Sequence, residues 1–234
     1  MVDVSRDTAR LCVFARVPEA GRVKTRLAET LGVAAALSAY ETLVSNTLTQ
    51  VCDHERYEIE FWIAGDSAQA SRAESVNSGN AAQQAAAIDL APQKTISDWV
   101  RQFDLTVRAQ TGVDLGTRMA AALRRCLTDG RDGIVIGTDC PDIDTAYVAQ
   151  AFTALHCSDL VLGPAEDGGY GLVGIARGTA DSLDAVFEDI SWGTGEVLGQ
   201  TLDRAKRCGL SVHLLATIWD VDSAADWARF LKSR

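Results

Sequence analysis

The chain has 234 residues, of which 47% are hydrophobic and 23% are charged, and its formal net charge is −10. Its length and composition predict a globular protein with a single domain over residues 1–234 and exclude a disordered or fibrous chain. The acidic balance excludes a broad nucleic-acid-binding face, because a polyphosphate backbone requires a basic surface. The polar N-terminus and the lack of a long apolar run predict a cytoplasmic protein with no membrane partner.

Short runs rich in valine, isoleucine and leucine alternate along the chain with segments of helical spacing. The runs predict strands at Leu11–Ala15, Ile59–Ala64, Leu105–Ala109, Ile134–Thr138, Leu160–Gly163, Leu172–Ile175 and Val212–Ala216. The helical segments are Val33–Val51, Gly116–Leu127, Thr145–Leu155, Glu196–Cys208 and Ser223–Leu231. This alternation predicts an α/β fold with a Rossmann-like, mostly parallel sheet that helices cover on both faces. In such sheets, ligands bind beyond the carboxyl ends of the strands.

The segment from Ser67 to Gln93 departs from this pattern. It is rich in alanine, serine, asparagine and glutamine and has few large apolar residues. We expect a surface loop with a short helix, or a partly mobile stretch, and assign it no function.

A basic segment follows the first predicted strand. From Arg16 to Arg26 it carries four cations and one anion, a local charge of +3 in a protein of −10. A cationic loop that opens a helix suits phosphate groups, because charged side chains and free backbone N–H groups converge there. The predicted nucleotide and phosphate ligands are Arg16, Gly21, Lys24, Thr25 and Arg26. A solvated basic turn is the alternative, and neither a Walker A motif nor a G-x-G-x-x-G fingerprint is present.

An acidic segment follows the predicted strand Ile134–Thr138, with carboxylates at Asp139, Asp142 and Asp144. Acidic residues at the carboxyl end of a parallel strand lie on the ligand side, and their oxygens suit a Mg²⁺ ion that bridges a diphosphate. Helix capping is the alternative for Asp142 and Asp144, and for Asp144 it is favoured. Asp139 is therefore the first choice as a metal ligand.

A glycine-rich segment, Gly163–Gly174, joins two predicted strands. The paired glycines Gly168 and Gly169 permit a positive φ and a close approach of the backbone to a ligand, while Asp167 and Tyr170 supply polar contacts. An ordinary Asp-Gly-Gly hairpin turn is the alternative.

Asp222 lies between the last predicted strand and the C-terminal helix. It either caps that helix or joins Asp139 on one cation, and one residue can combine both roles. Trp192, within Ser191–Gly195, borders an acceptor pocket if that segment binds ligand, although capping of the next helix by Ser191 or Thr194 is favoured.

Asp114–Met119 has the pattern of a helix start. Within it, Arg118 is a possible phosphate contact. A solvated arginine side chain is the favoured reading.

In combination, these segments resemble a bacterial family of GT-A-fold glycosyltransferases, some of them linked to arsenosugar biosynthesis. The resemblance covers nearly the whole chain and rests on five ordered motifs: Phe-Ala-Arg-x-Pro-x-x-Gly-x-x-Lys-Thr-Arg-Leu (Phe14–Leu27), Asp-Leu-Gly-x-Arg-Met (Asp114–Met119), Gly-x-Asp-Cys-Pro (Gly137–Pro141), Gly-Pro-x-x-Asp-Gly-Gly-Tyr (Gly163–Tyr170) and Asp-Val-Asp (Asp220–Asp222). More distantly, the pattern is similar to the molybdenum-cofactor and phospholactate guanylyltransferases, which also carry a basic loop after the first strand and a G-x-D-x-P segment. The resemblance implies the nucleotide-diphospho-sugar transferase fold, with a seven-stranded or similar mixed sheet.

The resemblance also implies roles for individual residues. Arg16, Lys24 and Arg26 would hold phosphates, and Asp139 and Asp222 would bind one metal ion from opposite sides. No recognised motif covers the Ser67–Gln93 segment, which leaves base and acceptor specificity open.

The leading hypothesis is sugar transfer from a nucleotide-diphosphate sugar to a small-molecule acceptor, with Mg²⁺ or Mn²⁺ neutralising the diphosphate leaving group. Lys24 would add positive charge where negative charge develops, and Asp167 is the candidate base for an inverting transfer. The residues expected on the acceptor side are Gly168, Gly169, Tyr170 and Trp192. Nucleotidyl transfer from an NTP to a phosphorylated acceptor, with pyrophosphate release, is the alternative. A non-catalytic nucleotide-binding regulator is a third reading, and the donor, the acceptor and the oligomeric state are left open.

Overall fold

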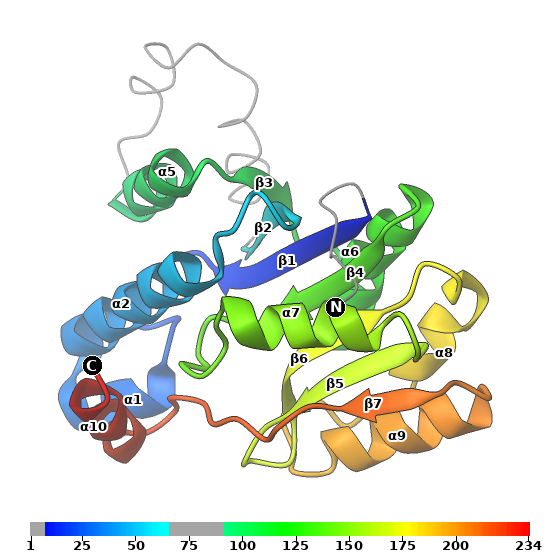
Figure 1. The fold of residues 1–234 in the computed structure, drawn as a ribbon. Helices are drawn as coiled ribbons and strands as arrows, with labels where there is room; N and C mark the ends of the chain where they lie inside the picture. The colour runs from blue at the N-terminus through cyan, green and yellow to red at the C-terminus, as the bar shows by residue number, and fades with distance from the viewer. Residues whose placement is uncertain (1–7, 66–90) are drawn as a thin grey trace.

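A single mixed sheet of seven strands organises residues 8–65 and 91–234, which are the residues that the computed structural model describes. The strand order is β3-β2-β1-β4-β6-β5-β7, and β6 runs antiparallel to both of its neighbours (Figure 1). The strands are β1 (Ala9–Arg16), β2 (Glu58–Ala64), β3 (Thr106–Ala109), β4 (Asp132–Ile136), β5 (Leu160–Pro164), β6 (Tyr170–Ile175) and β7 (Val212–Leu214). All seven predicted strands are present, and the predicted α/β class with a mostly parallel sheet is confirmed.

Helices cover both faces of this sheet. They are α1 (Thr25–Leu31), α2 (Val33–Val51), α5 (Ala91–Phe103), α6 (Leu115–Thr128), α7 (Thr145–Ala154), α8 (Leu183–Phe187), α9 (Val197–Arg207) and α10 (Ala224–Lys232), with a 3₁₀ turn at Ala180–Ser182. The sequence did not predict α5, and most of the Ser67–Gln93 segment lies outside the described residues. Within the described ranges, no helix has the length and apolar character needed to cross a membrane.

The central strand β1 supplies side chains to both layers of the core. Leu11, Val13 and Ala15 pack into the cluster that contains α2, α5 and α7, whereas Cys12 and Phe14 pack into the cluster that contains α6, α8 and α9. Alternate residues of a strand point to opposite faces, so a strand between two helical layers is apolar at every position. This double burial explains the uninterrupted apolar run in the sequence.

The strand order creates a topological switch point between β1 and β4. From β1 the chain proceeds outward to β2 and β3, then returns to the other side of β1 as β4. The two strands are parallel neighbours, so their carboxyl ends and the loops that follow them lie side by side. Open α/β sheets bind ligands at this type of position.

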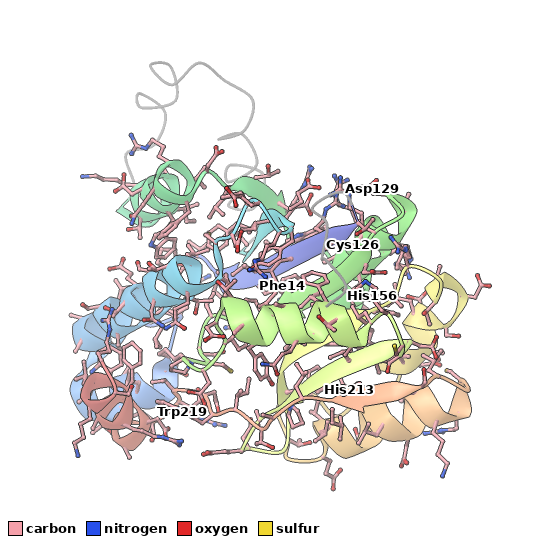
Figure 2. All side chains as sticks on the ribbon, in the orientation of Figure 1. Phe14, Cys126, Asp129, His156, His213 and Trp219 are labelled. Carbon is pink, nitrogen blue, oxygen red and sulfur yellow. The ribbon has the colours of Figure 1, made fainter. Side chains whose placement is uncertain are left out.

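The last segment of the chain brings α10 beside α1, at the end of the sheet where β1 and β4 finish (Figure 1). Before α10, the Trp219 Nε1–H donates to Asp142 Oδ1 at 3.1 Å, and the Arg229 guanidinium lies over the Trp219 ring, 4.0 Å from its centroid. Figure 2 labels Trp219 in this segment. Asp142 therefore anchors this segment and caps no helix, which corrects the capping reading for that residue. Docking of α10 carries Asp220 and Asp222 to the loop after β1.

Candidate functional site

A cavity of about 620 Å³ opens where β1 and β4 end and β6 begins. Ligand pockets commonly have volumes of roughly 300–1,000 Å³, so this one can hold a nucleotide-sized molecule. Its lining combines residues of all five motifs: the basic loop, the start of α6, the acidic loop, the glycine-rich turn and the Asp-Val-Asp segment. The structure thus brings together residues that are up to 198 positions apart in the sequence.

Lys24 lies at the centre of this arrangement. Its side chain is only 7% exposed, and Nζ lies 3.1 Å from Asp139 Oδ2 and 3.5 Å from Asp222 Oδ1. Burial alone would lower the pKa of Lys24, but the charges of the two carboxylates outweigh it and raise the pKa, so the ammonium stays protonated. The backbone of Lys24 is left-handed, with φ 46° and ψ 49°, a conformation that costs a non-glycine residue about 1–2 kcal/mol. The ion pairs hold this strained residue in the cavity.

Asp139 leaves the sheet just after β4, as predicted. Its carbonyl accepts a hydrogen bond from the Val221 N–H at 2.9 Å, which ties the acidic loop to the Asp-Val-Asp segment. Burial would raise the pKa of Asp139, but the charge and the hydrogen bond of Lys24 lower it, so the carboxylate is ionised at neutral pH.

Asp222 faces the cavity and does not cap α10. The N-cap is Ser223, whose side chain and that of Asp226 bond reciprocally to backbone N–H groups in a capping box. The capping interpretation of Asp222 is therefore wrong by one residue. Its carboxylate is free of that task and accepts a hydrogen bond from Arg26 Nη1 at 2.8 Å.

Asp220 also lines the cavity, although the sequence motif gave it no role. Burial and the nearby carboxylates of Asp139, Asp167 and Asp222 raise its pKa to about 6. The spacing of the motif could have predicted this position, because residues two positions apart in an extended segment face the same side, as Asp220 and Asp222 do. Val221 between them is fully buried, in keeping with this alternation.

Arg16, Thr25 and Arg26 line the cavity, whereas Gly21 lies in a turn outside the lining. The Arg16 backbone is held from both sides by one hydroxyl: the Arg16 N–H donates to Tyr40 Oη at 2.7 Å, and Tyr40 Oη donates to the Arg16 carbonyl at 2.9 Å. No pattern in the sequence distinguishes Tyr40 as a site residue, because its position in α2 fits the buried face of a helix.

The glycine-rich turn forms another part of the wall. Asp167 and Gly169 line the cavity, and Asp167 Oδ1 accepts the Gly169 N–H at 2.8 Å, which leaves Oδ2 outside this turn bond. Gly168 does not line the cavity. It has a φ of 88°, and a Cβ there would collide with the Gly195 backbone, so Gly168 lets the two loops pack together.

Two aromatic rings stand beside this turn and line the cavity. Tyr170 and Trp192 meet edge to face, with ring centroids 6.4 Å apart. The Trp192 ring also covers Gly116 at the start of α6, where an added Cβ would lie 2.6 Å from the ring. Trp192 therefore connects α6 with the glycine-rich turn.

The remaining helix-cap predictions had mixed outcomes. Asp144 caps α7 by accepting the Tyr147 N–H at 2.8 Å, as favoured, and Asp114 caps α6. The prediction that Ser191 or Thr194 caps α9 is wrong, because the N-cap is Glu196 and no side chain caps it. Arg118, for which a solvated side chain was favoured over a phosphate contact, is half-buried and lines the cavity.

Two acidic residues of the site lie around one cation. Among the described residues, no group of three or more His, Cys, Asp or Glu side chains is arranged to hold a metal ion. However, Asp139 and Asp222 both turn an oxygen toward one cation, the Lys24 ammonium. Carboxylate oxygens are ligands that Mg²⁺ and Mn²⁺ prefer, and these two carboxylates lie close to the same position. Lys24 thus stands between the two predicted metal ligands.

The profile of a family described as an uncharacterized protein conserved in bacteria (DUF2064) matches residues 47–194. No curated protein matches the chain. A solved structure from Desulfovibrio desulfuricans G20, provisionally named a nucleotide-diphospho-sugar transferase, is 28% identical with a TM-score of 0.77, covering 96% of this chain and 87% of that one.

Two more distant structures are similar in fold. The inositol-1-phosphate CTP transferase of T. maritima is 13% identical with a TM-score of 0.53, covering 95% of this chain and 91% of that one. Glucosyl-3-phosphoglycerate synthase of Mycobacterium tuberculosis, solved with Mn²⁺, UDP and glucosyl-3-phosphoglycerate, is 11% identical with a TM-score of 0.51, covering 91% and 70%. These likenesses confirm the predicted nucleotide-diphospho-sugar transferase fold.

Proposed function

The chain belongs to the DUF2064 family, and we propose that it is a transferase that moves the sugar of a nucleotide-diphosphate sugar to a small-molecule acceptor. The observation that carries this proposal is the position of Lys24, a buried ammonium held between Asp139 and Asp222 inside a nucleotide-sized cavity at the switch point of the sheet. The similar structure from Desulfovibrio desulfuricans supports it, since that protein bears a nucleotide-diphospho-sugar transferase name.

The basic loop provides the phosphate end of the proposed site. Arg16 and Arg26 line the cavity and present guanidinium groups, which match phosphate oxygens in forked geometry. Tyr40 fixes the backbone of Arg16, so the loop is shaped before a ligand arrives. Lys24 adds a compact positive charge where the leaving diphosphate becomes more negative.

A Mg²⁺ or Mn²⁺ ion would be held by Asp139 and Asp222, and it would supply further charge neutralisation at the diphosphate. Lys24 occupies the point that these carboxylates share, so its ammonium has to give up at least one ion pair when such a cation is bound. The displaced ammonium is then available to a phosphate oxygen.

Asp167 is the proposed base on the acceptor side. Its Oδ1 is engaged by the Gly169 N–H, and Oδ2 takes no part in that bond, so it can accept a proton from an acceptor hydroxyl. Tyr170 and Trp192 flank this turn and provide apolar surface for the substrate.

Nucleotidyl transfer is the second candidate, and the engagement of Asp167 in its own turn favours it. A reaction in which an acceptor phosphate attacks an NTP depends on positioning and positive charge and requires no base. Arg16, Lys24 and Arg26 would serve that reaction equally well.

A two-step experiment separates these functions. A thermal-shift screen of nucleotides and nucleotide sugars, with and without Mg²⁺, identifies the donor, since a ligand that binds the folded state raises the melting temperature. The protein is then incubated with Mg²⁺ and either the nucleotide sugar or the corresponding NTP, together with sugar and sugar-phosphate acceptors. Release of nucleoside diphosphate with transfer of the sugar supports glycosyl transfer. Acceptor-dependent pyrophosphate release would instead establish nucleotidyl transfer.

Asp139→Ala tests the metal end of the site. The variant should weaken metal-dependent nucleotide binding by at most a few kcal/mol while the fold stays intact, because Asp139 is a half-exposed residue after a strand and no core residue. Unchanged metal and nucleotide affinities in a folded variant would remove Asp139 from the site. Tight nucleotide binding that resists this substitution, with no turnover of any donor, would favour a non-catalytic regulator.

A further inference from the structure

Arg118 in the first turns of α6 has no part in the functions proposed above, although it lines the cavity. Its Nε–H donates to the Gly112 carbonyl at 3.1 Å. Within residues 8–65 and 91–234, no carboxylate lies within ion-pair distance of its guanidinium, in contrast to Arg26, which pairs with Asp222. Four N–H groups, those on Nη1 and Nη2, are therefore left for another acceptor.

The protein backbone sets the orientation of this guanidinium in advance. Gly112 has a φ of 143°, and a Cβ there would lie 2.5 Å from Thr117 Oγ1 and 2.8 Å from the Arg118 N, so the loop before α6 packs directly on the helix. Asp114 is the N-cap, and its Oδ1 accepts the Thr117 N–H and the Thr117 hydroxyl, both at 2.8 Å. Its charge attracts Arg118, but the two side chains form no ion pair. A fixed and unpaired guanidinium in a cavity is a receptor for an anion.

Arg118 and Lys24 approach the cavity from opposite faces of the sheet. The helix α6 packs in the core cluster of Met119 and Leu123, whereas α1 packs through Leu27 against α2 on the other face. Lys24 forms ion pairs with two aspartates, whereas no carboxylate of the described residues forms an ion pair with Arg118. The two cations therefore serve different parts of a ligand, or two ligands.

The surroundings of Arg118 link it to the acceptor side. Trp192 packs on Gly116, two residues before Arg118 in α6, and its ring meets Tyr170 of the glycine-rich turn. Leu115, which shares the cavity-facing side of α6 with Arg118, adds apolar surface.

We propose that Arg118 forms a second anion subsite, which binds a phosphate or carboxylate group of the acceptor. The proposal rests on the transferase function above and narrows its acceptor to an anionic small molecule. A planar guanidinium can hold either group through two parallel hydrogen bonds, which a lysine cannot reproduce.

The test uses the full chain saturated with Mg²⁺ and the nucleoside diphosphate that gives the largest thermal shift. Inorganic phosphate and, separately, acetate are then titrated by calorimetry at low ionic strength. Arg118→Met should weaken binding of the preferred anion at least tenfold, and Arg118→Lys should restore only part of it. Arg124→Met is the matched control, because Arg124 lies on the same helix, pairs with Asp184 and does not line the cavity.

The subsite would be overturned if Arg118→Met bound the anion as tightly as the unchanged protein does. It would also be overturned if the unchanged protein bound neither phosphate nor acetate. Thermal melting of each variant establishes that it is folded, and Arg118→Lys provides a second variant if the methionine form is not. If no nucleotide binds, the transferase function fails on its own, and the subsite is still judged by titrating phosphate and acetate into the nucleotide-free protein. With an identified donor, a phosphorylated acceptor should also show a KM that rises in Arg118→Met while the KM of the donor is unchanged.

Discussion

Replacing Lys24 with methionine probes the ion pairs at the centre of the cavity. The Lys24 Nζ lies 3.1 Å from Asp139 Oδ2 and 3.5 Å from Asp222 Oδ1, and both aspartate side chains are 43% exposed. At an effective dielectric constant of about 20, each pair at about 4 Å contributes roughly 4 kcal/mol of attraction. Solvent screening of half-exposed carboxylates and the cost of burying an ammonium remove most of this. We therefore expect Lys24→Met to lower the free energy of unfolding by only about 1–2 kcal/mol.

The effect on ligand binding should be larger than the effect on stability. A hydrogen bond to a charged group contributes about 1.5–3 kcal/mol, which corresponds to a roughly tenfold to hundredfold rise in the Kd of the nucleotide. The assay is calorimetric titration of the donor nucleotide in Mg²⁺, with urea unfolding of the same samples. Lys206→Met is the matched control, since Lys206 is exposed on α9 and does not line the cavity. A folded Lys24→Met protein that binds nucleotide as tightly as the control would refute the placement of phosphate at Lys24.

Three further substitutions test how the site is supported. Tyr40→Phe should raise the nucleotide KM about three- to tenfold and cost about 1–2 kcal/mol of stability, because the Arg16 N–H and carbonyl both lose their partner; unchanged kinetics would contradict this. Gly116→Ala should lower the free energy of unfolding by about 1–3 kcal/mol and raise the acceptor KM, since the new Cβ lies 2.6 Å from the Trp192 ring. A variant with an unaltered melting temperature and KM would show that the ring shifts freely. Glu60→Gln should lower the free energy of unfolding by about 3–5 kcal/mol in urea titrations without changing nucleotide affinity. The reason is that this fully buried carboxylate accepts hydrogen bonds from two arginines at 3.0 and 3.2 Å. A loss below about 1 kcal/mol would argue against a stabilising role of these ion pairs.

The fold could be predicted from the sequence because its strands are buried on both faces and stand out as apolar runs. The helix α5 was not predicted, because its segment has no such clear apolar pattern. Its buried residues Ile96 and Trp99 are few, and they follow a stretch rich in alanine, serine, asparagine and glutamine that gives little helical contrast. Packing of these two side chains against the core, rather than local pattern, defines that helix.

The candidate site was predictable where a motif lies at the end of a strand. Asp139 and the basic loop follow parallel neighbours, so their convergence follows from the topology. The contact between Lys24 and Asp222 depends in addition on the docking of α10, which no local pattern encodes. Asp222 and Ser223 are both good N-cap residues, and helix ends shift by one or two residues, so sequence alone could not choose between them.

The position of Lys24 also predicts that nucleotide and metal ion bind cooperatively. While the ammonium stands between Asp139 and Asp222, a divalent cation has to displace it, and a phosphate that attracts Lys24 lowers the cost of that displacement. Coupling between two ligands is reciprocal, so nucleotide should tighten Mn²⁺ binding by the same factor by which Mn²⁺ tightens nucleotide binding. Lys24→Met leaves the carboxylates without their internal cation, so it should bind Mn²⁺ more tightly than the unchanged protein when nucleotide is absent, and the cooperativity should shrink. Electron paramagnetic resonance counts free Mn²⁺ directly and requires no activity. Weaker Mn²⁺ binding by a folded Lys24→Met protein would mean that the two aspartates are partners of the lysine alone, and that the metal lies elsewhere or is not used.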